Sequence, residues 1–137
     1  MNIDPLEAVI AWLTTALTAV NGRVAGKHRY GEAWADDAIG VSVHMDGGLS
    51  DLYAAVVTPR LELRIYADDQ VKVVSVWREL ISLSRDNKRF KQNTSNGDAL
   101  IHYFLPETSL SLTYDEILKK ELGIVFFESM ISEAVVS

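Results

Sequence analysis

The chain contains no cysteine, so disulfide bonds, thiol nucleophiles and thiolate metal sites are all excluded. That absence suits a reducing compartment. The chain also lacks an apolar run of membrane-spanning length, because its longest uncharged segment, residues 8–22, is too short and too rich in threonine. Its start carries no basic region of the kind that opens a signal peptide. We therefore expect a protein that assembles in the cytoplasm and has no membrane anchor.

Basic residues are in the minority, and the formal net charge is -6. An acidic protein adheres poorly to nucleic acid and to anionic lipid, because both attract lysine and arginine. Between Glu32 and Asp51 the sequence has five acids and no lysine or arginine, whereas residues 85–91 hold four bases and one acid. The basic segment is able to contact phosphate, but a solvated loop is the favoured interpretation.

Signatures of catalysis and metal binding are missing as well. None of the histidines (His28, His44 and His102) stands at metal-ligand spacing from another ligand. No serine lies in a nucleophile-elbow motif, and the glycine pair after Asp46 lacks the lysine of a phosphate-binding loop. Adjacent acids at 36–37, 68–69 and 115–116 are typical of helix starts and solvated turns. We predict a protein that is not an enzyme, with no catalytic residue, metal or cofactor.

What the sequence does contain is regular apolar patterning in a chain of 137 residues, of which 48% are hydrophobic. This length predicts a single domain over residues 1–137. A helix is predicted over residues 4–21, with Asp4 as its N-cap, Pro5 in its first turn and Glu7 as the partner of a capping box. Asn21-Gly22 supplies its left-handed end.

Strands are indicated where apolar residues alternate with polar ones. This pattern occurs over residues 39–46 and again over 60–67, and residues 22–30 favour a shorter strand. The acids at 68–69 then predict the start of a second amphipathic helix that ends near residue 84. A loop and hairpin follow, with an Asn-Gly turn signal at 96–97.

The end of the sequence predicts one more strand, beginning near Leu122. Its run from Ile124 to Phe127 is apolar on both faces, which suits a central strand or one covered by another subunit. Residues 106–121 are compatible with a short helix around Asp115 or with an extended arm. This order of elements predicts an α+β fold, in which helices pack on one face of a mainly antiparallel sheet.

Several of these segments together resemble one protein family. They are the capped helix IDPLEAVIAWL, the loop GRVAGKHRYGEAWADDAIGVSV, the DGG sequence followed by VVTPRLELRIYADDQ and a helix, and TYDE before the final strand. In this order they resemble the tail-completion or tail-terminator proteins of long-tailed bacteriophages. The resemblance implies a virion protein of the neck, whose ring of usually six copies caps the tail tube, stops its polymerisation and joins it to the head connector.

The same resemblance gives the loop from Asp46 to Pro59 a role as an interaction arm, with a hairpin lying flat on its own sheet as the alternative. The interface residues that we expect are Trp34, Gly47, Gly48, Leu49, Leu52, Tyr53, Val56 and Phe90. Six copies at -6 carry about -36 in all, which suits a channel through which DNA passes without binding. The acids expected to face that channel are Glu32, Asp36, Asp37, Asp46 and Asp51.

Three other functions stay open at this point. A head-completion or connector protein has the same ring logic but binds the portal instead of the tube. A small hydrolase would use His44 or His102 with a nearby carboxylate. A generic dimeric α+β binding module would form only two-fold assemblies.

Overall fold

The structure, a computed structural model, describes residues 3–26, 38–49, 56–86 and 89–134, with the side chains of Gly48 and Leu49 left out. Within these residues the chain forms one sheet of seven strands in the order β1-β2-β3-β7-β5-β4, and β6 pairs with β7 beside this path. The strands are β1 (Val24–Ala25), β2 (Gly40–Leu49), β3 (Val56–Ala67), β4 (Phe90–Thr94), β5 (Gly97–Pro106), β6 (Ser111–Asp115) and β7 (Lys120–Glu133).

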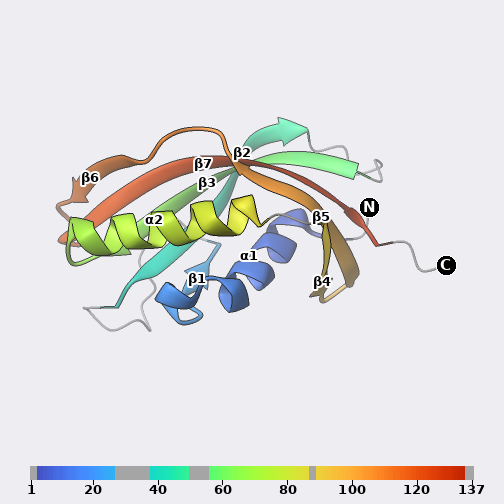
Figure 1. Cartoon of the computed structure of the whole chain (residues 1–137), viewed down its shortest axis with the longest axis horizontal. Coiled ribbons are helices and arrows are strands. Elements are labelled where there is room, and N and C mark those ends of the chain that lie inside the picture. Colours follow the sequence, from blue (N-terminus) through green and yellow to red (C-terminus); the bar gives the residue numbers. More distant parts are fainter. Residues whose placement is uncertain (1–2, 27–37, 50–55, 87–88, 135–137) are drawn as a thin grey trace.

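Two helices, α1 (Pro5–Ala16) and α2 (Gln70–Arg85), lie on the same face of the curved sheet (Figure 1). All strand pairs are antiparallel except β1 with β2, which run parallel. The predicted α+β fold with a mainly antiparallel sheet is therefore confirmed, although the sheet is mixed. No helix in the described part of the chain has the length and apolar character needed to cross a membrane.

Helix α1 begins as predicted, because the Asp4 carboxylate accepts a hydrogen bond from the backbone N–H of Leu6 at 2.9 Å. It ends five residues earlier than predicted, at Ala16, and a 3₁₀ turn over Thr18–Val20 follows. The reason is tertiary: Glu79 of α2 accepts hydrogen bonds from the N–H groups of Thr18 and Ala19, so these donors are not available to continue the helix. Asn21, at φ 49°, supplies the expected left-handed residue after the 3₁₀ turn.

The predicted capping box at the start of α1 is wrong. Glu7 does not turn back toward Asp4 but accepts hydrogen bonds from Ser95, from its backbone N–H at 2.7 Å and from its hydroxyl at 3.0 Å. Ser95 lies in the turn between β4 and β5, which is the predicted hairpin. The carboxylate therefore joins the first turn of α1 to a hairpin 88 residues away.

Strands β2 and β3 extend beyond their predicted limits and continue to pair after a bulge between Met45 and Gly48. Gly47 has φ 83°, a left-handed conformation that favours glycine and lets the backbone make this irregular step. Gly48 then pairs with Pro59 and Leu49 with Thr58. Both ends of the expected arm are thus strands of the sheet, while residues 50–55 lie outside the described residues.

The final strand is central, which is one of the two arrangements that its sequence left open, because β7 pairs with β3 along one side and with β5 and β6 along the other. The segment before it forms neither the short helix nor the unpaired arm that the sequence left open. Residues Ser111–Asp115 form strand β6, antiparallel to the first part of β7. Pairing with β7 creates this strand, since its own burial pattern shows no strand alternation.

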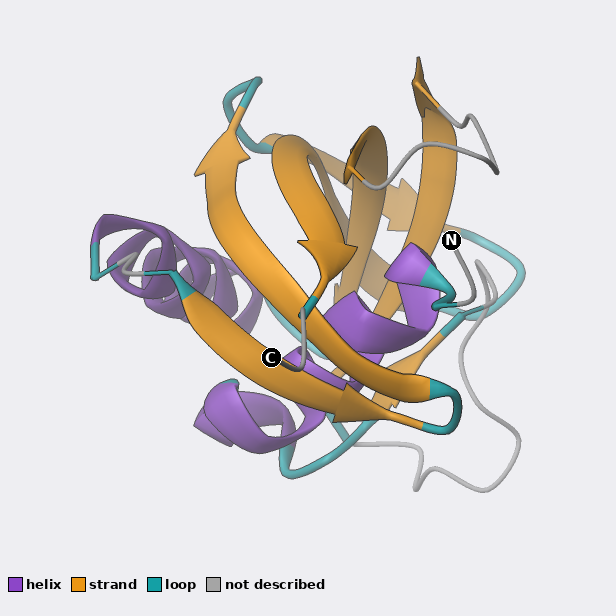
Figure 2. Cartoon of the chain, turned by 90° about the vertical axis from the view of Figure 1, so that its right-hand side faces the viewer, coloured by secondary structure: helices purple, strands orange, loops and turns teal. Residues whose placement is uncertain are grey.

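The core fills the space between the helices and the inner face of the sheet (Figure 2). Phe104 of β5 stacks on Phe127 of β7 with 4.2 Å between ring centroids. Trp12 of α1 contacts Phe104 edge-on at 5.1 Å and Phe90 of β4 at 5.1 Å. Aromatic pairs at these distances contribute about 0.5–1.5 kcal/mol each beyond the burial of their area, so this cluster fixes α1 on the sheet.

Candidate assembly surfaces

Strand β6 is the most exposed strand of the sheet. In the described part of the chain it pairs with β7 alone, so the hydrogen-bonding groups along its other edge have no strand partner. Leu112 and Tyr114 stand on one face of this strand and are 43% and 50% exposed. An open edge with apolar side chains is a template for pairing with another chain.

The turn from β6 to β7 carries a third exposed apolar side chain, Ile117, which is 92% exposed. The Asp115 carboxylate fixes the turn by accepting hydrogen bonds from the N–H groups of Ile117 and Leu118, both at 3.0 Å. Lys119 then adopts a left-handed conformation with φ 54°, which returns the chain into β7. The turn therefore presents Ile117, with Glu116 beside it, at one end of the molecule.

A groove runs between helix α2 and the end of strand β5. Its main hollow, of about 640 Å³, is lined by Trp77, Ile81, Ser84, Arg85, Tyr103, Leu105 and Pro106. A second hollow of about 310 Å³ shares Trp77, Ile81 and Arg85 and adds Arg78 and Ser82. We call the two together the α2 groove. Apolar side chains form most of its wall, and Leu105 is 39% exposed.

Among the residues that the structure describes, the charged ones that line the α2 groove are Arg78 and Arg85, and both are exposed. Neither arginine forms an ion pair with a residue that the structure describes. The indole Nε1 of Trp77 is buried and has no hydrogen-bond partner in the described part of the chain. The groove is thus an apolar and basic surface on a chain of net charge -6.

The opposite face of the sheet carries an ion-pair cluster around Arg60 of β3. Its guanidinium lies 3.0 Å from Asp46 of β2 and 3.1 Å from Glu107, which follows β5. The guanidinium carbon also lies 4.1 Å from the ring centroid of Phe126. Each partner is more than a third exposed, so the cluster adds little stability. Asp46 is thus paired with a cation of its own chain.

The hydrolase alternative would use His44 or His102 with a nearby carboxylate, and the strand register places His44 opposite Glu62 of β3. His44 is exposed on β2, and His102 Nε2 lies 2.8 Å from the hydroxyl of Ser132 on β7. Burial, followed by the positive charge of Arg89, holds the pKa of His102 below its ordinary value. Among the residues that the structure describes, no group of three His, Asp or Glu side chains is placed to hold a metal ion.

Many of the interface and channel residues expected from the sequence lie outside the described residues. These are Trp34, Leu52, Tyr53, Glu32, Asp36, Asp37 and Asp51. Of the others, Val56 is 41% exposed at the start of β3, and Gly47, Gly48 and Leu49 belong to β2. Phe90 is half-buried and packs on Trp12. The structure does not gather the described ones into one patch, because Phe90 lies on β4, at the far side of the sheet from β2.

Sequence reasoning missed the residues that form the two exposed surfaces. Trp77 and Ile81 follow the apolar spacing of the predicted second helix, so the sequence alone does not separate them from its buried residues. The sequence did carry a signal, because Val73, Val76, Leu80 and Ser84 already form one complete buried face. Val74, Trp77 and Ile81 are apolar but lie outside that buried face, so they are available to form a second apolar surface on the helix.

No family model and no curated protein matches this chain. Its functional interpretation therefore depends on the surfaces just described and on the resemblance seen in its sequence.

Proposed function

We propose that this protein is a structural component of a bacteriophage virion, a tail terminator. In this proposal a ring of copies, six in number, caps the tail tube, ends its polymerisation and joins it to the head connector. The observation that carries the proposal is the open edge of β6, where Leu112, Tyr114 and the neighbouring Ile117 are exposed. Side chains of this size at an unpaired strand edge are suited to burial against another subunit.

The arrangement of elements gives further support. The marks on which the resemblance depends include the capped helix, the DGG segment before a long strand, the second helix and the TYDE sequence, whereas residues 27–37 of the loop that also belongs to them lie outside the described residues. The described marks correspond here to α1, the β2–β3 pair, α2 and β6, in the same chain order. The TYD residues stand at the end of β6, next to the exposed turn. The segments that carry the resemblance therefore include the surface suited to assembly.

A ring needs two different patches on each subunit, since a head-to-tail interface joins unlike surfaces and closes without further growth. The edge of β6 with its turn is one candidate patch, and the α2 groove is a second. The negative charge of the chain adds to this picture, because walls of like charge let DNA pass without adhesion. The channel-facing acids remain a prediction, and Asp46 is the member of that set that the structure describes.

The test is to assemble tubes from a purified phage tail tube protein and to add the purified protein. A terminator should stop tube growth and appear as a ring at one tube end in electron micrographs. Tyr114→Asp should abolish capping, because it places a charge on the β6 surface. Asn96→Asp, which adds the same charge in the exposed β4–β5 turn, should cap normally. Tubes that grow at an unchanged rate would refute the proposal, and binding to purified portal in place of tubes would indicate a connector.

A further inference from the structure

The α2 groove and the β6–β7 turn have matching chemistry. The groove offers an apolar wall, formed by Trp77, Ile81 and Leu105, and two arginines, and none of its described lining residues is an acid. The turn offers an exposed isoleucine, Ile117, directly after an exposed acid, Glu116. An apolar knob with a negative charge beside it complements an apolar hollow with positive charges at its side.

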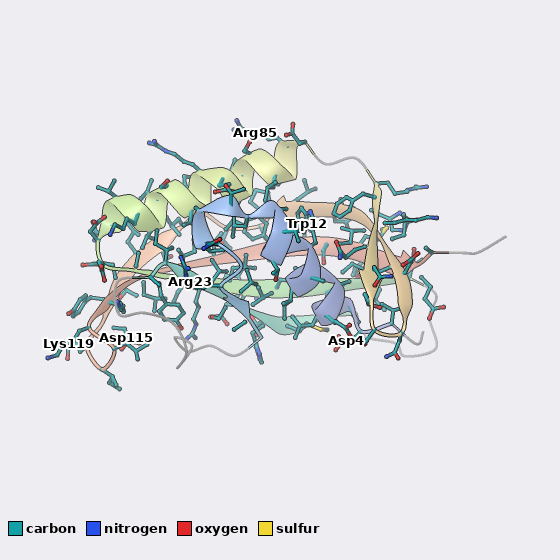
Figure 3. All side chains as sticks on the ribbon, turned by 90° about the horizontal axis from the view of Figure 1, so that it is seen from below. Asp4, Trp12, Arg23, Arg85, Asp115 and Lys119 are labelled. Atoms are coloured by element: carbon teal, nitrogen blue, oxygen red, sulfur yellow. The ribbon has the colours of Figure 1, made fainter. Side chains whose placement is uncertain are left out.

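The two surfaces lie in different places on the molecule. Figure 3 shows Asp115 and Lys119 together at one end, whereas Arg85 stands well away from them at the end of α2. They belong to separate elements, since the groove is built from α2 and β5 and the knob from the β6–β7 turn. A contact between a knob of one molecule and a groove of another therefore joins unlike surfaces, which is the head-to-tail geometry of rings.

The knob is held in shape before any partner arrives. The two hydrogen bonds accepted by the Asp115 carboxylate fix the backbone on either side of Ile117. A preformed turn loses less conformational entropy when it binds than a flexible one does. Residues 115–119 contain two acids and one lysine, Lys119, so this segment has a net charge of -1.

We propose that the β6–β7 turn of one copy seats in the α2 groove of a second copy. Ile117 then lies against Trp77, Ile81 and Leu105, and Glu116 faces Arg78 and Arg85. The occupant is a second copy because the groove is a basic surface on an acidic chain, so its charge complements other copies of the same chain. This inference rests on the proposed ring function and specifies the contact that builds the ring.

Complementation between two variants tests the pairing. Ile117→Asp removes the knob but keeps the groove, whereas the double variant Arg78→Glu, Arg85→Glu reverses the groove charge but keeps the knob. Each variant alone should self-associate at least about tenfold more weakly than the unmodified protein, as expected when a central interface residue or a charge pair is lost. Mixed together they should form a one-to-one dimer, because one intact knob meets one intact groove.

A second experiment exchanges the charges of the two surfaces. The triple variant Glu116→Arg, Arg78→Glu, Arg85→Glu should recover association that the double arginine variant has lost. Lys91→Glu, an exposed charge reversal on β4 outside the groove, serves as the matched control and should associate normally. Analytical ultracentrifugation and native mass spectrometry give the assembly size, and unchanged melting temperatures show that every variant is folded.

The outcomes separate this inference from the function on which it rests. If the mixed variants stay monomeric, or if the arginine variant still forms complete assemblies, the knob-and-groove contact is wrong. If the unmodified protein remains monomeric at every concentration and ionic strength, the inference is likewise refuted. Tube capping is scored independently in each case. A protein that caps tubes through another contact would keep the proposed function while this inference fails.

Discussion

The carboxylate of Glu79 holds the chain at Thr18, a residue 61 positions earlier in the sequence. It accepts hydrogen bonds from the Thr18 N–H, from the Thr18 hydroxyl at 2.8 Å and from the Ala19 N–H at 3.2 Å. One side chain of α2 thus caps the 3₁₀ turn that follows α1. It also ties the two helices together on the same face of the sheet.

Replacement of Glu79 by alanine should destabilise the protein by about 1–2 kcal/mol, since several donors lose their acceptor at once. Glu79→Gln keeps one acceptor oxygen and should cost less. Urea unfolding measures both values. Lys91→Ala, at an exposed position of β4 outside the proposed contact between copies, is the control and should leave the free energy of unfolding unchanged. Equal stability of all three variants would show that this contact does not anchor the helices.

The Glu7 contact predicts a pH dependence on the acid side. Hydrogen bonds from the Ser95 N–H, and then from its hydroxyl, hold the pKa of Glu7 below its ordinary value. The folded state therefore binds the proton less readily than the unfolded chain does. The stabilisation of the folded state by the Glu7 carboxylate is complete when the pH is above the ordinary pKa of glutamate. It is lost as the pH falls through the lowered pKa of Glu7 in the folded protein.

In measurements from about pH 6 down to about pH 3, the stability difference between the unmodified protein and Glu7→Gln should shrink steadily. Chemical denaturation at each pH gives this difference. Glu128→Gln, which removes an exposed carboxyl of β7 away from Ser95 and from the β6–β7 turn, should show a difference close to zero throughout. A gap for Glu7→Gln that stays constant with pH would contradict the assigned role of Ser95.

Gly123 of β7 has no side chain, and the space that a side chain would occupy is filled by Val73 and Leu110. A Cβ atom at this position would lie 2.5 Å from Cγ1 of Val73 on α2 and 2.9 Å from Cδ1 of Leu110. Gly123→Ala should therefore cost about 1–3 kcal/mol through overpacking. The double variant Gly123→Ala, Val73→Ala should be less destabilised than the sum of the single changes, because it removes the closest contact. Simple additivity in this cycle would exclude the steric explanation.

The lowered pKa of His102 can be followed by NMR titration of its ring protons. Burial is the first cause and the charge of Arg89 the second, so Arg89→Gln should move this pKa upward. Lys91→Gln removes an exposed charge of β4 that is not a cause of this shift, and it should have the smaller effect. Because the folded pKa lies below the unfolded one, acidification through the usual histidine range should reduce stability. An unmoved midpoint in Arg89→Gln would assign the whole shift to burial.

The sequence predicts the elements whose signals are local. Asp4 and Asp69 precede helices and both side chains accept hydrogen bonds from the first turn. In β3 the alternation of Leu61, Leu63 and Ile65 with polar residues matches the buried face observed. These features are readable because the residues that determine them are neighbours in the chain.

Features that depend on distant partners were not readable in this way. Strand β6 exists because β7 lies beside it, and Glu7 fits a capping-box pattern yet bonds to Ser95. The α2 groove has the same origin, since it forms where α2 meets the end of β5. A single sequence shows the residues of such a site, but it does not show that folding brings them close together.

The position of β7 has a consequence for synthesis on the ribosome. Among the described strands it is the last to be made, yet it separates β3 from β5 and supports β6. Until residues 120–133 emerge, β3, β5 and β6 all lack the strand with which they pair in the folded protein. Folding is therefore completed after translation of this strand, and premature termination before it would yield aggregation-prone fragments and no smaller native domain.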